Sequence, residues 1–303
     1  MRPAEPLRQG QIARGIGVEG PGYGFGRATG AVIGAVPVTV VPLAEVVVVE
    51  NESAAGELVA RSIVALIAAK PDAVLGLATG LTALPIYRAL ARTLADNLVD
   101  VSRVRGFALD EYVGLPAGHQ GSYRSVITRE VVEPLGLTPT NVHVPDGDLA
   151  GIQTAALNYE QALLESGGVD VQILGIGRTG HLGFNEPGSS FGSITRIKTL
   201  TEKTRADNAR FFDSPGDVPL HCITQGIRTI LRARHLVVLA FGESKADAIA
   251  AAIEGPITAS QPGSAIQFHP HVTVVVDEAA ASKLANLAYY KHAWLHKPPW
   301  QGL

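Results

Sequence analysis

Short apolar runs of strand length alternate along the chain with longer stretches of helical period, and this alternation limits the fold more than any other feature. The runs are rich in β-branched residues and show no polar alternation, as expected of strands buried on both faces. They lie at residues 44–50, 72–78, 105–110, 169–177, 234–242 and 271–278. This succession predicts an α/β fold with an open, mostly parallel sheet and helices on both faces.

The composition supports a large folded core and excludes several kinds of partner. Hydrophobic residues make up 46% of the 303 residues and charged residues 17%, which argues against wholesale disorder. The formal net charge of −3 offers no basic excess for a nucleic-acid backbone, and no apolar run reaches the roughly 18–20 residues that cross a bilayer. We therefore expect neither a nucleic-acid nor a membrane partner. Cys222 is the only cysteine, which excludes an intramolecular disulfide and favours a cytoplasmic location.

The sequence pattern divides the chain into three parts. Residues 1–43 mix Gly, Pro and Arg without a helical or alternating period, and they lack the continuous apolar stretch of a secretory signal. We expect them to be a disordered extension or a stretch that precedes the native start. Residues 44–290 carry the strand–helix alternation and are expected to form one domain, which a C-terminal tail follows at 291–303.

The turn GLATGLT at residues 76–82 joins a predicted strand to a predicted helix. Parallel α/β sheets bind their ligands beyond the carboxyl ends of the strands, where this turn lies. Its backbone N–H groups and the positive end of the helix dipole can form an anion pocket, to which Thr79 and Thr82 can add hydroxyl donors. The alternative is an ordinary strand-to-helix turn without a ligand.

Two adjacent carboxyl groups, Asp110 and Glu111, occur in the sequence LDEYVGLP at the end of the third predicted strand. Side chains alternate along an extended chain, so these two point in different directions. One can face the crevice while the other braces the loop. A solvated acidic loop is the alternative.

The Gly-rich stretch GIGRTGHLGFNEPGSS at residues 175–190 is the most specific motif of the chain. It places His181 and Glu186 five residues apart, which suits a proton-transfer pair whose carboxylate orients the imidazole. A metal site would need a third ligand, such as His119 or His269, and the spacing of those residues does not call for one.

Two cations, Arg210 and Lys245, complete the set of candidate residues. Each of them alone is most simply a solvated surface charge. A Lys at the start of a helix opposes the helix dipole, however, so the position of Lys245 favours an anionic ligand.

Five segments in order resemble the glucosamine-6-phosphate deaminase family, and together they cover roughly residues 44–290. They are LGLATGLT, FALDEYVGLPAGHQGSY, ILGIGRTGHLGFNEPGSS, RIKTLTEKTRADNARFF and EGPITASQPGSAIQFHPHVTVVVDE. The resemblance implies a Rossmann-like sheet, a homo-oligomer, and neither a metal nor an organic cofactor. It implies an aldose–ketose isomerisation with deamination, in which glucosamine 6-phosphate and water give fructose 6-phosphate and ammonia.

The resemblance also implies roles for single residues. Asp110 matches the base that moves a proton from C2 to C1, His181 matches the histidine that helps to open the sugar ring, and Glu186 matches its carboxylate partner. The residues that match phosphate ligands, with Arg210 on a mobile lid, are Thr79, Gly80, Leu81, Thr82, Arg210 and Lys245.

Regulated bacterial members of the family bind N-acetylglucosamine 6-phosphate at a second site between subunits. The residues that resemble parts of this allosteric site are Ser189, Arg196, Lys198 and Tyr289. His235 stands where those members place a glutamate.

The chain departs from the family pattern at several positions. Leu81 replaces a Gly or Ser, and it would be strained by ~1–2 kcal/mol if its φ were positive. Thr179 replaces an Asp or Asn beside His181, and a hydroxyl can hydrogen-bond but carries no charge. We therefore expect a weakened or rearranged network around the histidine. Ala83 replaces a Pro, and Ile194 replaces an Arg.

Two other functions compete with the deaminase. One is the same chemistry on another amino-sugar phosphate, such as galactosamine 6-phosphate. The other is a sugar-phosphate-sensing module, because some transcription regulators use this fold as an effector domain. A sensor predicts a helix-turn-helix segment, for which residues 1–43 show no helical period, and the loss of Asp110 or His181, both of which are present.

Overall fold

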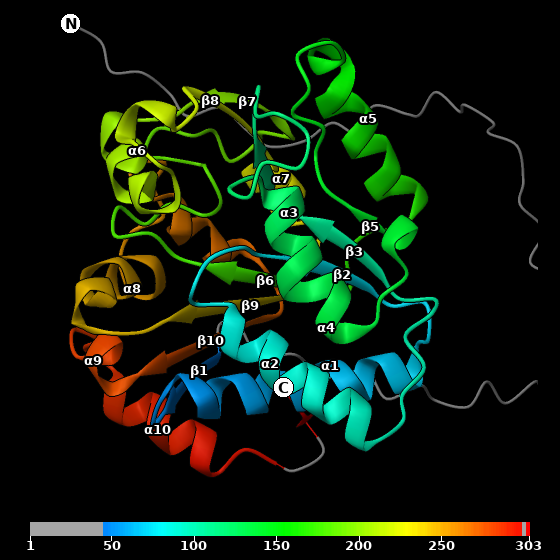
Figure 1. Ribbon diagram of the computed structural model, residues 1–303. Coiled ribbons are helices and arrows are strands. Elements are labelled where there is room, and N and C mark those ends of the chain that lie inside the picture. The colour runs from blue at the N-terminus through cyan, green and yellow to red at the C-terminus, as the bar shows by residue number, and fades with distance from the viewer. Residues whose placement is uncertain (1–44, 299–300) are drawn as a thin grey trace, which may run out of the picture. The chain divides into compact units, whose positions relative to one another are not determined.

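A seven-stranded parallel sheet runs through the part of the chain that the computed structural model describes, residues 45–298 and 301–303 (Figure 1). The predicted extension at 1–43 lies outside these residues. Every neighbouring pair of strands in this sheet is parallel. In spatial order the strands are β1 (Glu45–Val49), β10 (Val272–Asp277), β9 (His235–Ala240), β6 (Val171–Gly175), β2 (Val74–Leu77), β3 (Arg105–Ala108) and β5 (Val142–His143).

Both faces of the central strands are covered. Every residue of β2 and of β9 is buried, so side chains that point to either face are removed from solvent. The longer helices around the sheet are α1 (Glu52–Ala69), α2 (Leu84–Asp96), α5 (Ile152–Glu165), α8 (Ala246–Ile253) and α10 (Leu287–Leu295). The predicted open α/β fold is thus confirmed. None of the helices in the described residues combines the length and the apolar character that a membrane span needs.

A second sheet has three antiparallel strands, β4 (Asp110–Tyr112), β8 (His221–Thr224) and β7 (Arg196–Thr199). The prediction of one strand over 105–110 is wrong at this point, because β3 ends at Ala108 and Asp110 opens β4. Leu109 connects the two sheets. Its N–H donates to the carbonyl of Leu77 in β2, and its carbonyl accepts from the backbone N–H of Gln225. Asp110 pairs with Thr224.

Residues 123–135 form a continuous helical stretch in which a π-helix separates two α-helical segments. α3 (Tyr123–Ile127) continues as the π-helix η1 (Thr128–Val132) and then as α4 (Glu133–Leu135). The remaining short helices are η2 (Pro139–Asn141), α6 (Glu202–Asn208), η3 (Ala209–Phe211), η4 (Pro215–Asp217), α7 (Ile227–Ile230), η5 (Glu243–Lys245), η6 (Pro262–Phe268) and α9 (Glu278–Ala281).

The boundary that the sequence pattern places at residue 290 falls inside α10, which ends at Leu295. This end of the chain is tied to the edge strand, because Nζ of Lys297 lies 2.7 Å from Oε2 of Glu45 in β1. Both side chains are largely buried, so the ion pair is shielded from solvent. The division into one domain and a tail stays a prediction.

Candidate active site

Four loops that carry predicted site residues follow neighbouring strands. β9, β6, β2 and β3 are adjacent in the sheet and parallel, so their carboxyl ends lie along one edge. The turn with Thr79 follows β2, and Asp110 follows β3. His181 and Glu186 follow β6, and Lys245 follows β9. The topology therefore assembles the candidates from distant parts of the sequence at the edge where such sheets bind ligands.

The turn after β2 is fixed to the helix that it enters. The hydroxyl of Tyr87 in α2 accepts from the N–H of Ala78 at 3.1 Å and donates to its carbonyl at 2.9 Å. Gly80 takes the positive φ of this turn, 97°. Leu81 does not have a positive φ, so the strain considered for a bulky residue there is absent, and its backbone N–H remains a possible donor.

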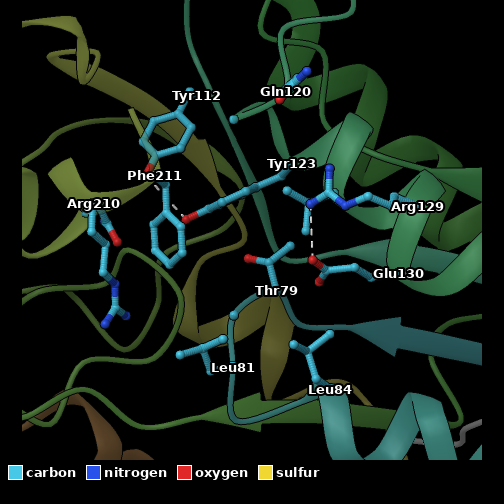
Figure 2. A pocket seen from close by; sticks show the side chains of 14 residues that line it. Thr79, Leu81, Leu84, Tyr112, Gln120, Tyr123, Arg129, Glu130, Arg210 and Phe211 are labelled. Carbon is cyan, nitrogen blue, oxygen red and sulfur yellow. Dashed lines mark hydrogen bonds and ion pairs between the residues drawn. The ribbon is translucent and has the colours of Figure 1, made fainter. Parts of the chain in front are cut away.

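A cavity of about 550 Å³ opens beside this turn (Figure 2). Thr79, Gly80 and Leu81 line one part of it, and Arg210 and Phe211 line another. The other residues around it are Leu84, Tyr112, Gln120, Gly121, Tyr123, Val126, Arg129, Glu130 and Asn208. The structure thus brings three of the predicted phosphate ligands together with Arg210. Thr82, Lys245 and the catalytic candidates are not among the lining residues.

The side chain of Asp110 lies beneath the site without a hydrogen-bond donor. The residue is 5% exposed, and among the described residues none donates a hydrogen bond to its carboxyl group. Burial, and to a smaller extent the charge of Glu111, raise the pKa of Asp110 to about 8. Gly183 approaches it closely with a φ of +55°, since a Cβ there would lie 3.2 Å from Oδ2. This carboxyl group can therefore exchange a proton near neutral pH.

Glu111, the neighbouring carboxyl group, has the bracing role that strand alternation predicts. It accepts hydrogen bonds of 2.8 Å from the backbone N–H groups of Tyr112, Tyr123 and Arg124. The latter two belong to the first turn of α3, whose free N–H groups need acceptors. Glu111 thus fixes the start of α3, whose Tyr123 lines the cavity.

Three hydrogen-bond donors surround Glu186. Its Oε2 accepts from the hydroxyl of Thr179 at 3.1 Å, while its Oε1 accepts from the hydroxyl of Thr204 and lies 3.4 Å from Nδ1 of His181. Burial opposes ionisation of this carboxyl group, but the bonds from His181, Thr204 and Thr179 outweigh it and lower the pKa of Glu186 to about 2. Glu186 is therefore an anion at neutral pH.

The hydroxyl of Thr179 bridges the two members of the His–Glu pair. It lies 2.9 Å from Nδ1 of His181 and donates its single proton to Glu186, which can only accept. The Thr179 oxygen can therefore accept from Nδ1–H, which leaves Nε2 of a neutral imidazole with a free lone pair. A single hydroxyl thus connects the imidazole of His181 to the carboxylate of Glu186.

The lack of a side chain at Gly177 leaves room for the His181 ring. A Cβ at residue 177 would lie 2.1 Å from Cε1 and Nε2 of the imidazole, so any larger residue would displace it. Asn185 fixes the following part of the loop, because its buried amide donates to the carbonyls of Leu182 and Gln225 at 2.8 Å. The positions of His181 and Glu186 are thus set by buried contacts.

The two cations lie on different short helices, Lys245 on η5 and Arg210 on η3. Nζ of Lys245 donates to the carbonyl of Ile176, at the end of β6, at 2.8 Å. Burial lowers the pKa of Lys245, and the charges of Arg178 and Arg210 add to this effect. Arg210 is exposed, with its guanidinium 4.7 Å from the ring centre of Phe211 (Figure 2). A dianion between Lys245 and Arg210 would relieve their repulsion.

The predicted allosteric residues do not all meet within one chain. Arg196 and Lys198 lie on β7, and Ser189 is buried with a hydroxyl that has no hydrogen-bond partner among the described residues. Tyr289 is exposed on α10, which packs against β1 at the far edge of the large sheet (Figure 1). His235 is buried and stacks on His271 with ring centres 3.7 Å apart.

Several residues of the site were not found by sequence reasoning. Thr204 and Asn185 are ordinary polar residues in the sequence, and only the fold shows that they contact Glu186 and pin its loop. The segment at 258–263 also braces this loop: Ala259 accepts from the N–H of Gly188, and Gly263 donates to Gly180, at 2.7 Å each. No group of three or more His, Cys, Asp or Glu side chains in the described part of the chain could hold a metal ion.

The fold and the position of its crevice are those of an α/β enzyme family. The model of the glucosamine-6-phosphate isomerases/6-phosphogluconolactonase family matches residues 49–275, and the chain belongs to this family. The resemblance that the sequence motifs indicated is thereby confirmed.

Two curated relatives match the sequence of this chain over nearly their whole length. A glucosamine-6-phosphate deaminase of Bifidobacterium longum is 57% identical over 268 residues, which are 86% of this chain and 99% of that protein. A glucosamine-6-phosphate deaminase of Streptomyces coelicolor is 59% identical over 260 residues, 86% of this chain and all of that protein.

Solved structures show the same fold. A monomeric glucosamine-6-phosphate deaminase superposes with a TM-score of 0.77 and 38% identity, covering 79% of this chain and 99% of that one. A 6-phosphogluconolactonase of Trypanosoma brucei has a TM-score of 0.64 at 19% identity, over 80% of this chain and 98% of that one. At that identity the likeness shows the fold alone.

Proposed function

We propose that this chain is a glucosamine-6-phosphate deaminase, which converts glucosamine 6-phosphate and water into fructose 6-phosphate and ammonia. The relatives at 57% and 59% identity that carry this name support the reaction. The observation that carries the proposal is the pairing of two unlike carboxyl groups at one sheet edge. One is the proton-exchanging Asp110, and the other is Glu186, an anion bound to the network of His181.

The phosphate group is held at the open side of the site. The backbone and hydroxyl groups of Thr79 to Thr82 donate hydrogen bonds, and Lys245 and Arg210 supply positive charge. Remote binding of this kind supports the chemical step, because the energy gained at the phosphate orients the sugar against the proton-transfer groups.

The chemistry begins with opening of the pyranose ring. Nε2 of His181 accepts the proton of the C1 hydroxyl and returns it to the ring oxygen, while Glu186 stabilises the transient imidazolium. In the open-chain aldehyde the carboxylate of Asp110 removes the C2 proton and delivers it to C1 through an enolamine. Water then adds to the imine carbon at C2, the C–N bond breaks, and ammonia leaves as the C2 ketone forms.

Partners and setting follow from the same proposal. The chain takes a small amino-sugar phosphate, binds neither nucleic acid nor membrane, and acts in the cytoplasm as a homo-oligomer without a metal or organic cofactor. The relative with 38% identity is described as monomeric, so the mass in solution is the measurement that tests the assembly. Stimulation by N-acetylglucosamine 6-phosphate tests the allosteric role of Ser189, Arg196, Lys198 and Tyr289.

The decisive experiment measures ammonia release by the purified protein from glucosamine 6-phosphate and galactosamine 6-phosphate side by side. We expect release from the glucosamine ester and a very poor rate with unphosphorylated glucosamine. Lys245→Ala should mainly raise KM, because the lysine contacts the phosphate and not the reacting carbons. A preference for the galactosamine ester would reassign the substrate, and tight binding of either ester without ammonia would favour a sensor.

A further inference from the structure

Thr204 lies on α6, outside the Gly-rich loop, and its side chain contacts Glu186 of that loop. Its side chain is buried, and its hydroxyl donates a hydrogen bond to Oε1 of Glu186 across 18 positions of sequence. Oε1 is also the carboxylate oxygen that lies 3.4 Å from Nδ1 of His181. Thr204 therefore contacts the atom through which Glu186 acts on the imidazole.

The direction of each hydrogen bond around Thr204 is determined. The backbone N–H of Thr204 donates to the hydroxyl oxygen of Thr201 at 3.1 Å, and this hydroxyl donates to the oxygen of Thr204 at 2.9 Å. The proton of Thr204 is then directed at Glu186, an anion that can only accept. Thr201 is the N-cap of α6, so the start of this helix sets where the donor to Glu186 stands.

We propose that Thr204 is a positioning residue, whose hydroxyl fixes Oε1 of Glu186 and draws off part of its charge, so that Glu186 supports the transient imidazolium of His181 without holding the ring in that form. The proposal rests on the role given to the His–Glu pair in the proposed function. Without this donor the full charge of Oε1 would act on Nδ1–H and stabilise the imidazolium, which cannot serve as a base.

The docking of α6 does not depend on this bond alone. Nη2 of Arg178 on the loop donates to both carboxylate oxygens of Asp207 on α6, at 2.9 and 3.0 Å, and both side chains of this ion pair are exposed. The ion pair holds α6 against the loop, so the hydrogen bond from Thr204 to Glu186 is not required for that packing. Among the charged groups of this region, Arg178 on the loop, Asp207 on α6 and Arg210 on η3 interact with Lys245 on η5, and Glu186 interacts with His181.

The test compares Thr204→Val, which keeps the shape and removes the hydroxyl, with Thr204→Ser, which keeps the hydroxyl. We expect Thr204→Val to lower kcat about tenfold, as removal of a bond to a charged group does, with KM changed less than about twofold. The acidic limb of its pH–rate profile should move upward, and Thr204→Ser should restore both. Thr93→Val is the matched control: it makes the same change in α2, where the hydroxyl donates only to the carbonyl of Ala89, so the limb should stay in place.

A second measurement makes the result independent of ammonia release. Nitrogen NMR of the His181 ring should show a higher protonation midpoint in Thr204→Val than in the wild type, the Ser variant or Thr93→Val. A midpoint and pH profile unchanged in Thr204→Val would overturn the proposal, and so would the same changes in Thr93→Val. Absence of ammonia release by the wild type would instead refute the proposed function.

Discussion

The regions around Asp110 and Glu186 place a carboxyl group in the same site under opposite conditions. Both side chains are largely buried, but the first has no donor among the described residues and the second has three. Burial therefore raises the pKa of Asp110 to about 8, while donated bonds lower that of Glu186 to about 2. The difference shows that donated hydrogen bonds outweigh burial where they are present and keep the carboxyl group an anion, whereas burial without donors lets it carry a proton.

The largest effect is expected from Asp110→Asn. The amide keeps the shape of the side chain and removes its basicity, so kcat should fall by at least ~10², the scale of general-base catalysis. Substrate binding should survive, because the phosphate contacts lie on other loops. Kinetics with glucosamine 6-phosphate measure the loss, and Asp100→Asn at an exposed position serves as the control. A variant with near-normal kcat would remove Asp110 from the proposed mechanism.

Glu186→Gln removes the charge of the second carboxyl group in the comparison. The neutral amide no longer stabilises an imidazolium, so kcat should fall by about tenfold or more, and the acidic limb of the pH–rate profile should move to lower pH. Glu202→Gln, which changes an exposed carboxylate in the first turn of α6, should leave both unchanged. If the limb stays in place in Glu186→Gln, the carboxylate does not act through His181.

Asp110→Asn should also change the dependence of stability on pH. The folded pKa of Asp110 is raised from 3.8 to about 8, so its stabilising contribution is fully present below pH ~4 and is lost as the pH rises through about 8. The amide resembles the protonated form and does not titrate. The variant should therefore match the wild type near pH ~4 and exceed it above pH 8 by at least ~1 kcal/mol, about 2–4 °C in Tm. Calorimetry at the two pH values checks this, and an equal Tm difference at both would contradict the raised pKa.

The large sheet was predictable because its strands are local patterns. Apolar runs such as residues 234–242 have no polar alternation, and the fold buries β9 on both faces. Asp110 follows β3 and His181 follows β6, so both lie beyond the carboxyl edge of that sheet.

The small sheet and the contacts of α6 were not predictable in the same way. β4, β8 and β7 have three or four residues each, too few for a period. Their pairing joins Asp110 to Thr224, which are separated in the sequence by several helices and strands. Thr204 lies in the polar sequence TLTEKTRADN, where a threonine is typical of a solvated helix. Its contact with Glu186 depends on the packing of α6 against the Gly-rich loop, which no local sequence pattern predicts.

The smallest effect is expected at Thr179, where a carboxylate would make the His181 region resemble other members of the family. Thr179→Asp removes the hydroxyl bridge and adds a second negative charge beside Nδ1 of His181. An added anion favours the imidazolium, so the acidic limb of the pH–rate profile should move upward by up to about one pH unit, while KM stays roughly constant. Thr179→Ser, which keeps the bridging hydroxyl, should retain the wild-type profile. A pH–rate profile that is the same in Thr179→Asp as in the wild type would show that the bridge does not govern His181, and that the three donors of Glu186 serve the architecture of the loop alone.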